Sequence, residues 1–406
     1  MGTRIIAPVV KTDTLLAWVA ALLLAACLFS HTVALRMLLL AAGIGLAAIV
    51  AVRRGDEIRA LPPIWLPFLL WALWAGLSIA WSVEPARSVK EWHNEVLYTG
   101  AALWICYVGA QARNGARIFL ALVGAGAVGA CAVALYSFSL GFNHYQHGWH
   151  GGPGNHSSAL LTLMPCAAIA GWYAARHRPL RWAPLLAAGV VALFLASAYA
   201  TVNRTIWLGL AVEAMVVGGL VLRRGAAPVA RPKLLMVALA ATVLAASAAM
   251  LLNIQAKRDA IGAGRALEDD LRFALWPEIV ELIGERPLTG YGFGRGLLRS
   301  PLKEELGGTD NLWHAHNLFL EVLLQMGLPG LFLLGLLLAA VVRVGWRLSA
   351  SPDPAATACG AALLAMLAGM LVRNMTDTLF VRQNSLLFWG VAGVLMGLAA
   401  RRPRPG

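Results

Sequence analysis

The chain has 406 residues, of which 59% are hydrophobic and only 13% are charged. A soluble domain usually carries about 25% charged residues, so the composition excludes a soluble enzyme and predicts an all-α, polytopic integral membrane protein. The net charge of +13 does not indicate nucleic-acid binding, because Lys and Arg are scattered between apolar runs instead of being grouped on one soluble face.

Apolar runs recur along almost the whole chain. A bilayer core needs roughly 20 apolar residues for each helical crossing, and the runs predict about twelve transmembrane helices. Their expected ranges are 14–30, 33–52, 62–81, 96–112, 117–138, 157–175, 182–200, 205–222, 234–254, 327–343, 355–372 and 384–400.

The orientation of these helices follows from the placement of Lys and Arg in short loops. Basic residues resist translocation, and most of the 33 Lys and Arg residues fall on one side if the N-terminus is cytoplasmic. We therefore expect both termini to be cytoplasmic. The predicted organisation is helices 1–9 in residues 1–254, a large outward loop in 255–316, and an outward-edge helix with helices 10–12 in 317–406.

The large outward loop is the place where function is expected. Loops longer than about 15 residues are uncommon unless they bind, gate or catalyse. Within this loop, residues 267–285 predict an amphipathic helix lying on the membrane or over the helix bundle, with a kink at Pro277. Its apolar positions are Leu271, Leu275, Ile279 and Leu282.

The segment HAHNLFLEVLLQMGLPG, residues 314–330, carries the first candidate for chemistry. His316 and Asn317 precede a mostly apolar helical stretch, which places the histidine at a helix start. A helix N-terminus disfavours the charged imidazole, and a neutral imidazole can act as a general base. The alternative is that His316 or Asn317 only caps the helix, while Gly327 and Gly330 allow close packing.

Arg204 is the second candidate, because it stands in a short outward turn where basic residues are few. A forked guanidinium suits a phosphate or pyrophosphate anion. The alternative is that Arg204 extends to lipid headgroups. Glu213, within the following apolar run, could pair with an arginine or serve in packing.

The large loop supplies further arginines. Arg272 precedes Trp276 by four residues, and Arg265 lies seven residues before Arg272. The glycine-rich stretch PLTGYGFGRG, residues 287–296, lacks the Lys-Ser/Thr ending and preceding strand of a phosphate-binding loop. It predicts a turn with close backbone approach.

Histidines are also frequent in the segment HYQHGWHGGPGNH, but they do not have the spacing and carboxylate partner of a familiar metal site. We therefore predict no metal and no cofactor. The histidines concerned are His144, His147, His150 and His156.

These motifs together resemble the O-antigen ligase and polymerase superfamily, over about residues 155 to 395. WSVEP, from Trp81, resembles a weaker N-terminal signature, and Asn155 resembles the family's Pro-Asn step, although the order here is Pro153, Gly154, Asn155. The motif residues are His316, Asn317, Gly327 and Gly330; Arg204, Trp207 and Leu208; Arg272 and Trp276; and Pro287, Leu288, Gly290 and Gly292.

The resemblance implies a membrane glycosyltransferase at the periplasmic face of a bacterial inner membrane. Its donor would be an O-antigen polysaccharide on undecaprenyl pyrophosphate, and its acceptor the lipid A core, with membrane lipids around it. Arg204 and Arg272 would hold the pyrophosphate and His316 would take the acceptor proton, giving metal-independent transfer with inversion. Further candidates for substrate binding are Arg265, His314, Asn317, Trp276 and Asn155.

Alternatives within the superfamily differ in the acceptor. A polymerase would extend the lipid-linked glycan, and a protein O-oligosaccharyltransferase would modify Ser or Thr. The paired histidines, the length and the single large late loop favour the ligase. A transporter is a different class, but no repeat relates the two halves, and the charged candidates lie at one face, Glu213 excepted.

Overall fold

The computed structural model describes residues 6–55, 58–177, 183–223, 248, 251–252, 271–297, 314–378, 380 and 382–401. Within these ranges all regular structure is helical. The helices are α1 (Ile6–Cys27), α2 (Val33–Arg53), α3 (Trp65–Leu77), η1 (Ser78–Trp81), α4 (Pro85–Trp92), η2 (His93–Leu97), α5 (Tyr98–Ala110), α6 (Gly115–Ser139), α7 (Phe142–Gln146), α8 (Gly152–His177), α9 (Ala183–Ala200), α10 (Arg204–Arg223), α12 (Leu271–Glu285), α13 (Leu318–Ser349), α14 (Pro354–Asn374) and α15 (Arg382–Ala400).

The predicted crossings overlap described helices, except 234–254, which lies almost entirely outside the described residues. Five described helices are long and apolar enough to cross a membrane, namely α2, α6, α13, α14 and α15. Shorter apolar helices cover Thr12–Cys27, Trp65–Trp81 and Leu185–Ala200. These apolar helices are those of a membrane protein, while a count of twelve crossings stays a prediction.

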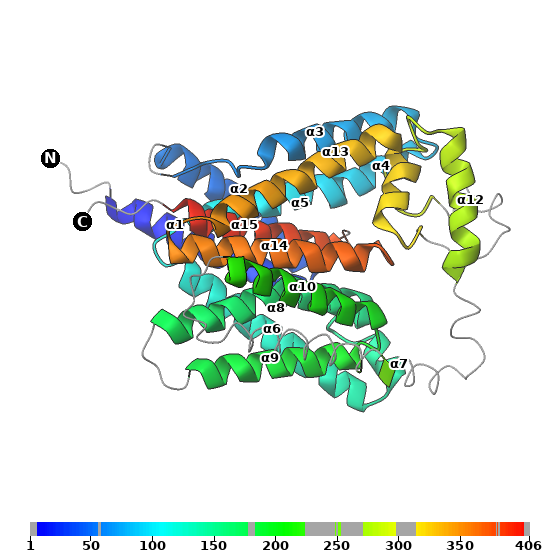
Figure 1. Cartoon of the computed structure of the whole chain (residues 1–406). Coiled ribbons are helices and arrows are strands. Elements are labelled where there is room, and N and C mark those ends of the chain that lie inside the picture. Colours follow the sequence, from blue (N-terminus) through cyan, green and yellow to red (C-terminus); the bar gives the residue numbers. More distant parts are fainter. Residues whose placement is uncertain are drawn as a thin grey trace.

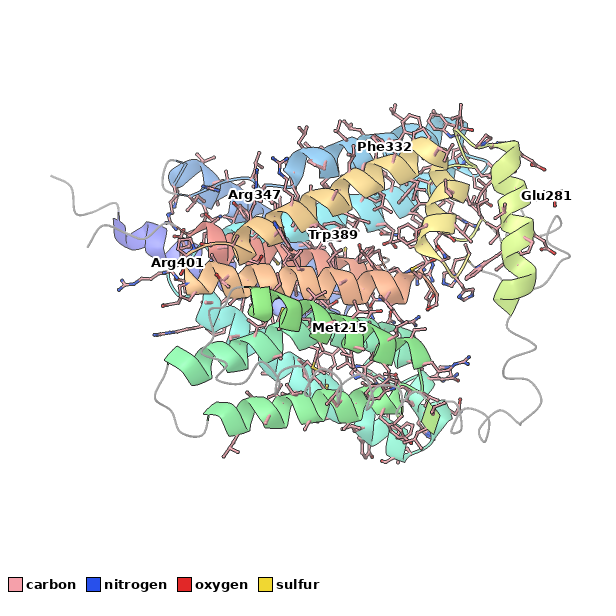
Figure 2. All side chains as sticks on the ribbon, viewed as in Figure 1. Met215, Glu281, Phe332, Arg347, Trp389 and Arg401 are labelled. Carbon is pink, nitrogen blue, oxygen red and sulfur yellow. The ribbon has the colours of Figure 1, made fainter. Side chains whose placement is uncertain are left out.

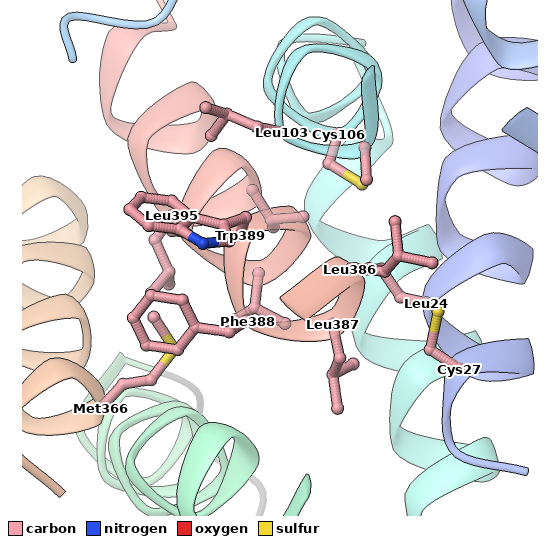
Figure 3. Packing of buried hydrophobic residues seen from close by; sticks show 14 of the residues in the cluster. Leu24, Cys27, Leu103, Cys106, Met366, Leu386, Leu387, Phe388, Trp389 and Leu395 are labelled. Carbon is pink, nitrogen blue, oxygen red and sulfur yellow. The ribbon is translucent and has the colours of Figure 1, made fainter. Parts of the chain in front are cut away.

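Helix α15 lies at the centre of the bundle, between α1, α5 and α14 (Figure 3). Its Phe388 is fully buried, and Leu386 and Trp389 are nearly so. Small residues bring the neighbouring backbones close, since a Cβ added at Gly393 would collide with the backbone carbonyl of Leu103 in α5. The tight packing of α15 fixes the position of its first turn, near the site described below.

The bundle has two ends that differ in structure (Figure 1). Helices α4, α7 and α12 lie at one end, here named the α12 end, whereas α1 begins and α15 ends at the other. Helix α12 lies across the α12 end with Leu275, Ile279 and Leu282 buried against a cluster that includes Tyr291. The predicted amphipathic helix is therefore confirmed for Leu271–Glu285, and it continues through Pro277.

Helix α13 is interrupted at Gly327, whose φ of 65° and ψ of −169° are non-helical. The interruption frees carbonyl groups of the preceding turn: Leu324 O accepts from Tyr291 N at 2.9 Å, and Gln325 O accepts from Gly292 N at 2.9 Å. A Cβ at Gly290 would lie 2.5 Å from the Gln325 carbonyl carbon. The glycine-rich stretch is thus a turn in close backbone contact, as its sequence predicts.

The segment WSVEP packs on the same turn. The Trp81 indole N–H donates to Thr289 O at 2.8 Å, and Val83 N donates to Tyr291 O at 3.0 Å. Two motifs separated by about 200 residues therefore form one structural unit with the break in α13.

Candidate active site

His316 lies at the α12 end, directly before α13. Its backbone has a φ of 51°, a left-handed conformation that non-glycine residues rarely adopt and that usually marks a constrained site. The Asn317 side chain caps the helix by accepting hydrogen bonds from Phe319 N at 2.9 Å and Leu320 N at 3.2 Å. The predicted position of the histidine at a helix start is confirmed.

Both histidines of the motif face one carboxylate, that of Asp377. His314 Nε2 lies 3.0 Å from Asp377 Oδ1, and His316 Nδ1 lies 3.6 Å from the same oxygen. The other oxygen, Oδ2, accepts from Arg373 Nη2 at 3.1 Å, and Thr378 N donates to Oδ1 at 2.8 Å. Asp377 is therefore held by several donors and presents its charge to both rings.

The surroundings lower the pKa of both Asp377 and His314, but for different reasons. Burial alone would raise the pKa of Asp377, but the contact with His316, the charge of Arg373 and the Thr378 N–H together hold it below its ordinary value. Burial and the nearby charges of Arg295 and His316 lower the pKa of His314 to about 3, although Asp377 opposes this. Asp377 is thus ionised and His314 neutral at pH 7.

Exposure separates the two histidines as well. The His314 side chain is 9% exposed, whereas that of His316 is 32% exposed. The two rings lie 4.1 Å apart between centroids. With Nδ1 of His316 facing Asp377, its Nε2 is the ring nitrogen that remains for a substrate.

Neighbouring groups fix the short segment that carries the histidines. Trp276 of α12 donates through its indole N–H to Ala315 O at 2.9 Å, and Ala315 N donates to Glu321 Oε2 at 2.7 Å. Gln325 Nε2 donates to Glu321 Oε1 at 2.7 Å. Trp276 therefore has a positioning contact here. Hydrogen bonds from Trp276 of α12 and to Glu321 of α13 hold the segment that carries the histidines.

Arg204 begins α10, which runs antiparallel to α14. A Cβ at Gly369 of α14 would touch Glu213 of α10. At about 1.5 Å per residue, Arg204 lies about 14 Å beyond Glu213, and Asn374 about 8 Å beyond Gly369, both towards the α12 end. Arg204 is thus at the level of the segment that carries Asp377.

Glu213 itself is 3% exposed, and neither carboxyl oxygen has a hydrogen-bond partner among the described residues. It lies inside the bundle against Gly369 and away from the histidines. The structure gives it no pairing with an arginine in the described part of the chain.

The other arginine candidates are described only in part. Arg272 lies in the first turn of α12, and its side chain is outside the described atoms. Arg265 lies outside the described residues altogether. Their proximity to His316 stays a prediction.

Asn155 lies in the first turn of α8, and both ends of its amide are engaged. Its Nδ2 donates to Gly151 O at 2.8 Å, and its Oδ1 accepts from Asn384 Nδ2 at 3.0 Å. The observed contacts therefore join α8 to the start of α15. Similarly, Asn317 Nδ2 donates to Met375 O at 3.2 Å, joining the α13 cap to the Asp377 segment.

The described residues also contain one group whose chemistry would suit a metal ion. The ligand atoms of His314, His316 and Asp377 all lie within 4.8 Å of one another. In contrast, His150 and His156 pack edge to face, with ring centroids 5.2 Å apart. The converging trio is equally an orienting carboxylate with two imidazoles, which is the arrangement of a general base.

Asp377 and Arg373 are the site residues that sequence reasoning missed. They lie at the end of α14 in the stretch RNMTDT, about 60 residues after His316, and no motif links them to it. The available signal is an Arg and an Asp four residues apart in a polar interval between two apolar runs.

Comparison with known proteins gives one family. Residues 189–335 match the family described as O-antigen ligase. The matched range contains Arg204, Arg272, His314 and His316, while Asn155 and Asp377 lie outside it. No curated protein matches the chain. The match thus supports the membership of this chain in the O-antigen ligase superfamily.

Proposed function

We propose that the protein is an O-antigen ligase, which transfers a polysaccharide from undecaprenyl pyrophosphate to the lipid A core at the periplasmic face of the inner membrane. The observation that carries the proposal is a partly exposed imidazole, that of His316, which lies beside the partly buried Asp377 carboxylate at a strained helix start within the family match. The family suggests membrane glycosyltransferase activity, and the α12 end is then the periplasmic end.

In the proposed reaction His316 is the general base. Its Nε2 takes the proton from an acceptor hydroxyl, and the oxygen attacks the anomeric carbon of the donor sugar. The bond from that carbon to the pyrophosphate oxygen breaks, and the leaving pyrophosphate keeps the electron pair. A single displacement inverts the anomeric configuration. Asp377 orients the ring and stabilises the imidazolium that forms, as a carboxylate does in other base–orienter pairs.

Arg204 and Arg272 are assigned to the leaving group. Charge develops on the pyrophosphate as the glycosidic bond breaks, and guanidinium groups stabilise that charge without a metal. The start of α10 at Arg204, at the same end of the bundle as the Asp377 segment, supports this assignment. Arg265 is a further candidate for the same anion, and a polymerase with the same donor is the second candidate function.

The proposal is tested by incubating the purified protein with undecaprenyl-pyrophosphate glycan, with and without lipid A core, and resolving the products by size. Glycan on the core only when the core is present supports the ligase, whereas lengthening of the lipid-linked glycan without core indicates a polymerase. No transfer to either would contradict both. His316→Ala should abolish transfer while the protein remains folded and inserted, and wild-type activity in that variant would remove His316 as base.

A chelation arm tests the metal-free mechanism, which matters because His314, His316 and Asp377 could hold an ion. We expect full activity after exhaustive treatment with chelator. Loss of activity that one added cation restores would contradict the proposed mechanism.

A further inference from the structure

A cavity lies between α3, α5, α13 and α15 and the loop that carries Gly294, and Leu318 at the start of α13 lines it. Its volume is about 60 Å³, which is enough for a few water molecules or one edge of a polar ligand. Most of its wall is apolar and aromatic. The aromatic residues are Trp71, Phe293, Phe380 and Trp389.

Four residues that line this cavity each have a buried side-chain atom without a hydrogen-bond partner among the described residues. The atoms are Glu95 Oε1, Trp71 Nε1, Arg295 Nε and Thr378 Oγ1. The Glu95 residue is 7% exposed and Thr378 is 3% exposed. Buried polar atoms are normally hydrogen-bonded, so four such atoms around one small cavity point to a ligand that can form hydrogen bonds.

The backbone around Glu95 supports the same reading. Glu95 lies in η2, which is a π-helical turn between α4 and α5, and such turns often occur at functional sites. Its Oε2 accepts a hydrogen bond from Arg382 N at 2.6 Å, which fixes the carboxyl at the start of α15. The other oxygen, Oε1, has no hydrogen-bond partner among the described residues, and Glu95 lines the cavity.

The cavity adjoins the candidate active site at two points. Thr378 lines the cavity through its side chain, while its backbone N–H donates to Asp377 Oδ1 at 2.8 Å. Leu318 lines the cavity and follows Asn317, the helix cap next to His316. A ligand in the cavity would therefore lie beside the reacting groups.

The four unpaired polar atoms of the cavity discriminate between classes of ligand. A lipid chain would leave all four polar atoms unpaired. A phosphate would accept from Arg295 and Trp71 but would meet the Glu95 carboxyl. A hydroxyl group both donates and accepts, so it can satisfy the carboxyl and the N–H donors together, and the aromatic walls suit the apolar face of a sugar ring.

We propose that this cavity binds a hydroxyl-bearing edge of a saccharide substrate, with Glu95, Trp71, Arg295 and Thr378 as specificity-determining residues. The proposal rests on the proposed function, because it assumes that saccharides reach this site. The sugar would come from the acceptor core or from the donor glycan, and the experiment separates the two sources.

The test measures binding and does not require transfer. The full-length, detergent-solubilised protein is titrated with two probes by saturation-transfer NMR: deacylated lipid A core oligosaccharide, and donor glycan released from its pyrophosphate. Thr378→Val removes the hydroxyl and keeps the shape, and the Thr378 backbone bond to Asp377 remains. Trp71→Phe removes the indole N–H and keeps an aromatic but smaller side chain. Each should raise the Kd of one probe about three- to tenfold.

Matched controls come from elsewhere in the chain. Trp346→Phe lies in the half of α13 remote from His316, and Glu281→Gln lies on the exposed face of α12, labelled in Figure 2. Both should leave the Kd unchanged. Thermal unfolding of every variant checks that the fold is retained, and Glu95→Gln, which can still accept from Arg382 N, is a second variant if one fails to fold.

The outcomes are distinct. A higher Kd for the core oligosaccharide in the cavity variants identifies the acceptor as the ligand. A higher Kd for the released donor glycan identifies the donor. Wild-type Kd values in the cavity variants, or no binding of either probe by the wild type, would overturn the proposal and leave a water-filled cavity. Saccharide binding without transfer by the wild type would instead contradict the proposed function and retain the binding site.

Discussion

At the scale of single residues, the site depends on the different partners of the two carboxylate oxygens of Asp377. Oδ1 faces both imidazoles, whereas Oδ2 is engaged by the nearly buried Arg373. The arginine stabilises the carboxylate, and the carboxylate in turn sets the orientation of His316. The unusual φ of His316 indicates that the surrounding bonds, from the Asn317 cap to the Trp276 contact, hold a conformation that the chain alone would not favour.

Asp377→Asn tests this arrangement. The amide retains the shape of the carboxylate but not its charge, so it would no longer stabilise an imidazolium. We expect kcat for transfer to fall by about 10²–10⁴, as losses of general-base catalysis do, with a KM near the wild-type value. An unchanged kcat across pH 6–8 would exclude Asp377 as the positioning residue. Glu281→Gln is the control for removal of an exposed carboxylate.

Arg204→Lys tests the leaving-group assignment. Lysine keeps the charge but lacks the fork that binds a diphosphate bidentately. We expect transfer to be severely impaired, with weaker binding of undecaprenyl-pyrophosphate glycan. Near-normal donor affinity and turnover would remove Arg204 from the pyrophosphate site. Arg347→Lys, at the opposite end of α13, is the matched control.

At the scale of elements, the break in α13 joins distant motifs into one unit. The first turns of α13, the glycine-rich turn and the WSVEP segment share backbone hydrogen bonds, and Trp74 of α3 donates to Met326 O at 3.0 Å beside the break. The carbonyls released at Gly327 are therefore paired, which removes the cost of an interrupted helix. The glycines serve backbone geometry and not a phosphate cradle.

Gly327→Ala should destabilise the protein. An alanine at φ 65° is strained, and its Cβ would lie 2.5 Å from the Leu288 carbonyl group. We expect a loss of about 1–3 kcal/mol in the free energy of unfolding, measured as a lower thermal midpoint in detergent. Gly335→Ala lies in the same helix with no atom within 4 Å of its Cβ. It should be neutral or slightly stabilising, and an equal loss in both variants would contradict the explanation.

The sequence identified the His316 and Asn317 helix start, the apolar stripe of α12 and the turn character of residues 287–296, because each depends on local spacing. The sequence did not identify Asp377, Arg295 or Glu95 as residues of the site or of the cavity beside it. Each of them is polar in an otherwise ordinary context. Asp377 meets His314 across 63 residues of sequence, and Glu95 and Arg295 line one cavity with Leu318 at the start of α13. Long-range placement of this kind leaves no periodic pattern in the chain.

At the scale of the whole molecule, the charged and polar groups of the site lie at one end of an apolar bundle. Figure 2 shows Glu281 on α12 at that end, with Arg347 and Arg401 towards the other. This distribution agrees with the orientation that the Lys and Arg pattern predicts, in which short cytoplasmic loops are basic.

Single introduced cysteines test the orientation. Cys27, Cys106, Cys131 and Cys359 are buried and Cys166 is partly buried, so native labelling should be low. In intact spheroplasts a membrane-impermeant maleimide should label Glu281→Cys and spare Arg347→Cys, which should react only after the membrane is permeabilised. The reverse pattern would place the α12 end in the cytoplasm.

The interruption at Gly327 also has a mechanical consequence. The part of α13 after it, residues 328–349, is about 33 Å long and matches a bilayer core on its own. When bilayer thickness changes, such a helix adjusts its tilt, whereas Leu328 N, directly after the break, donates to Pro287 O at 2.8 Å and holds the break on the glycine-rich turn. The turns that begin at Leu318 are anchored separately, through Asn317 and Glu321. We therefore expect the geometry of the first turns of α13 to depend on these hydrogen bonds more than on the tilt of residues 328–349.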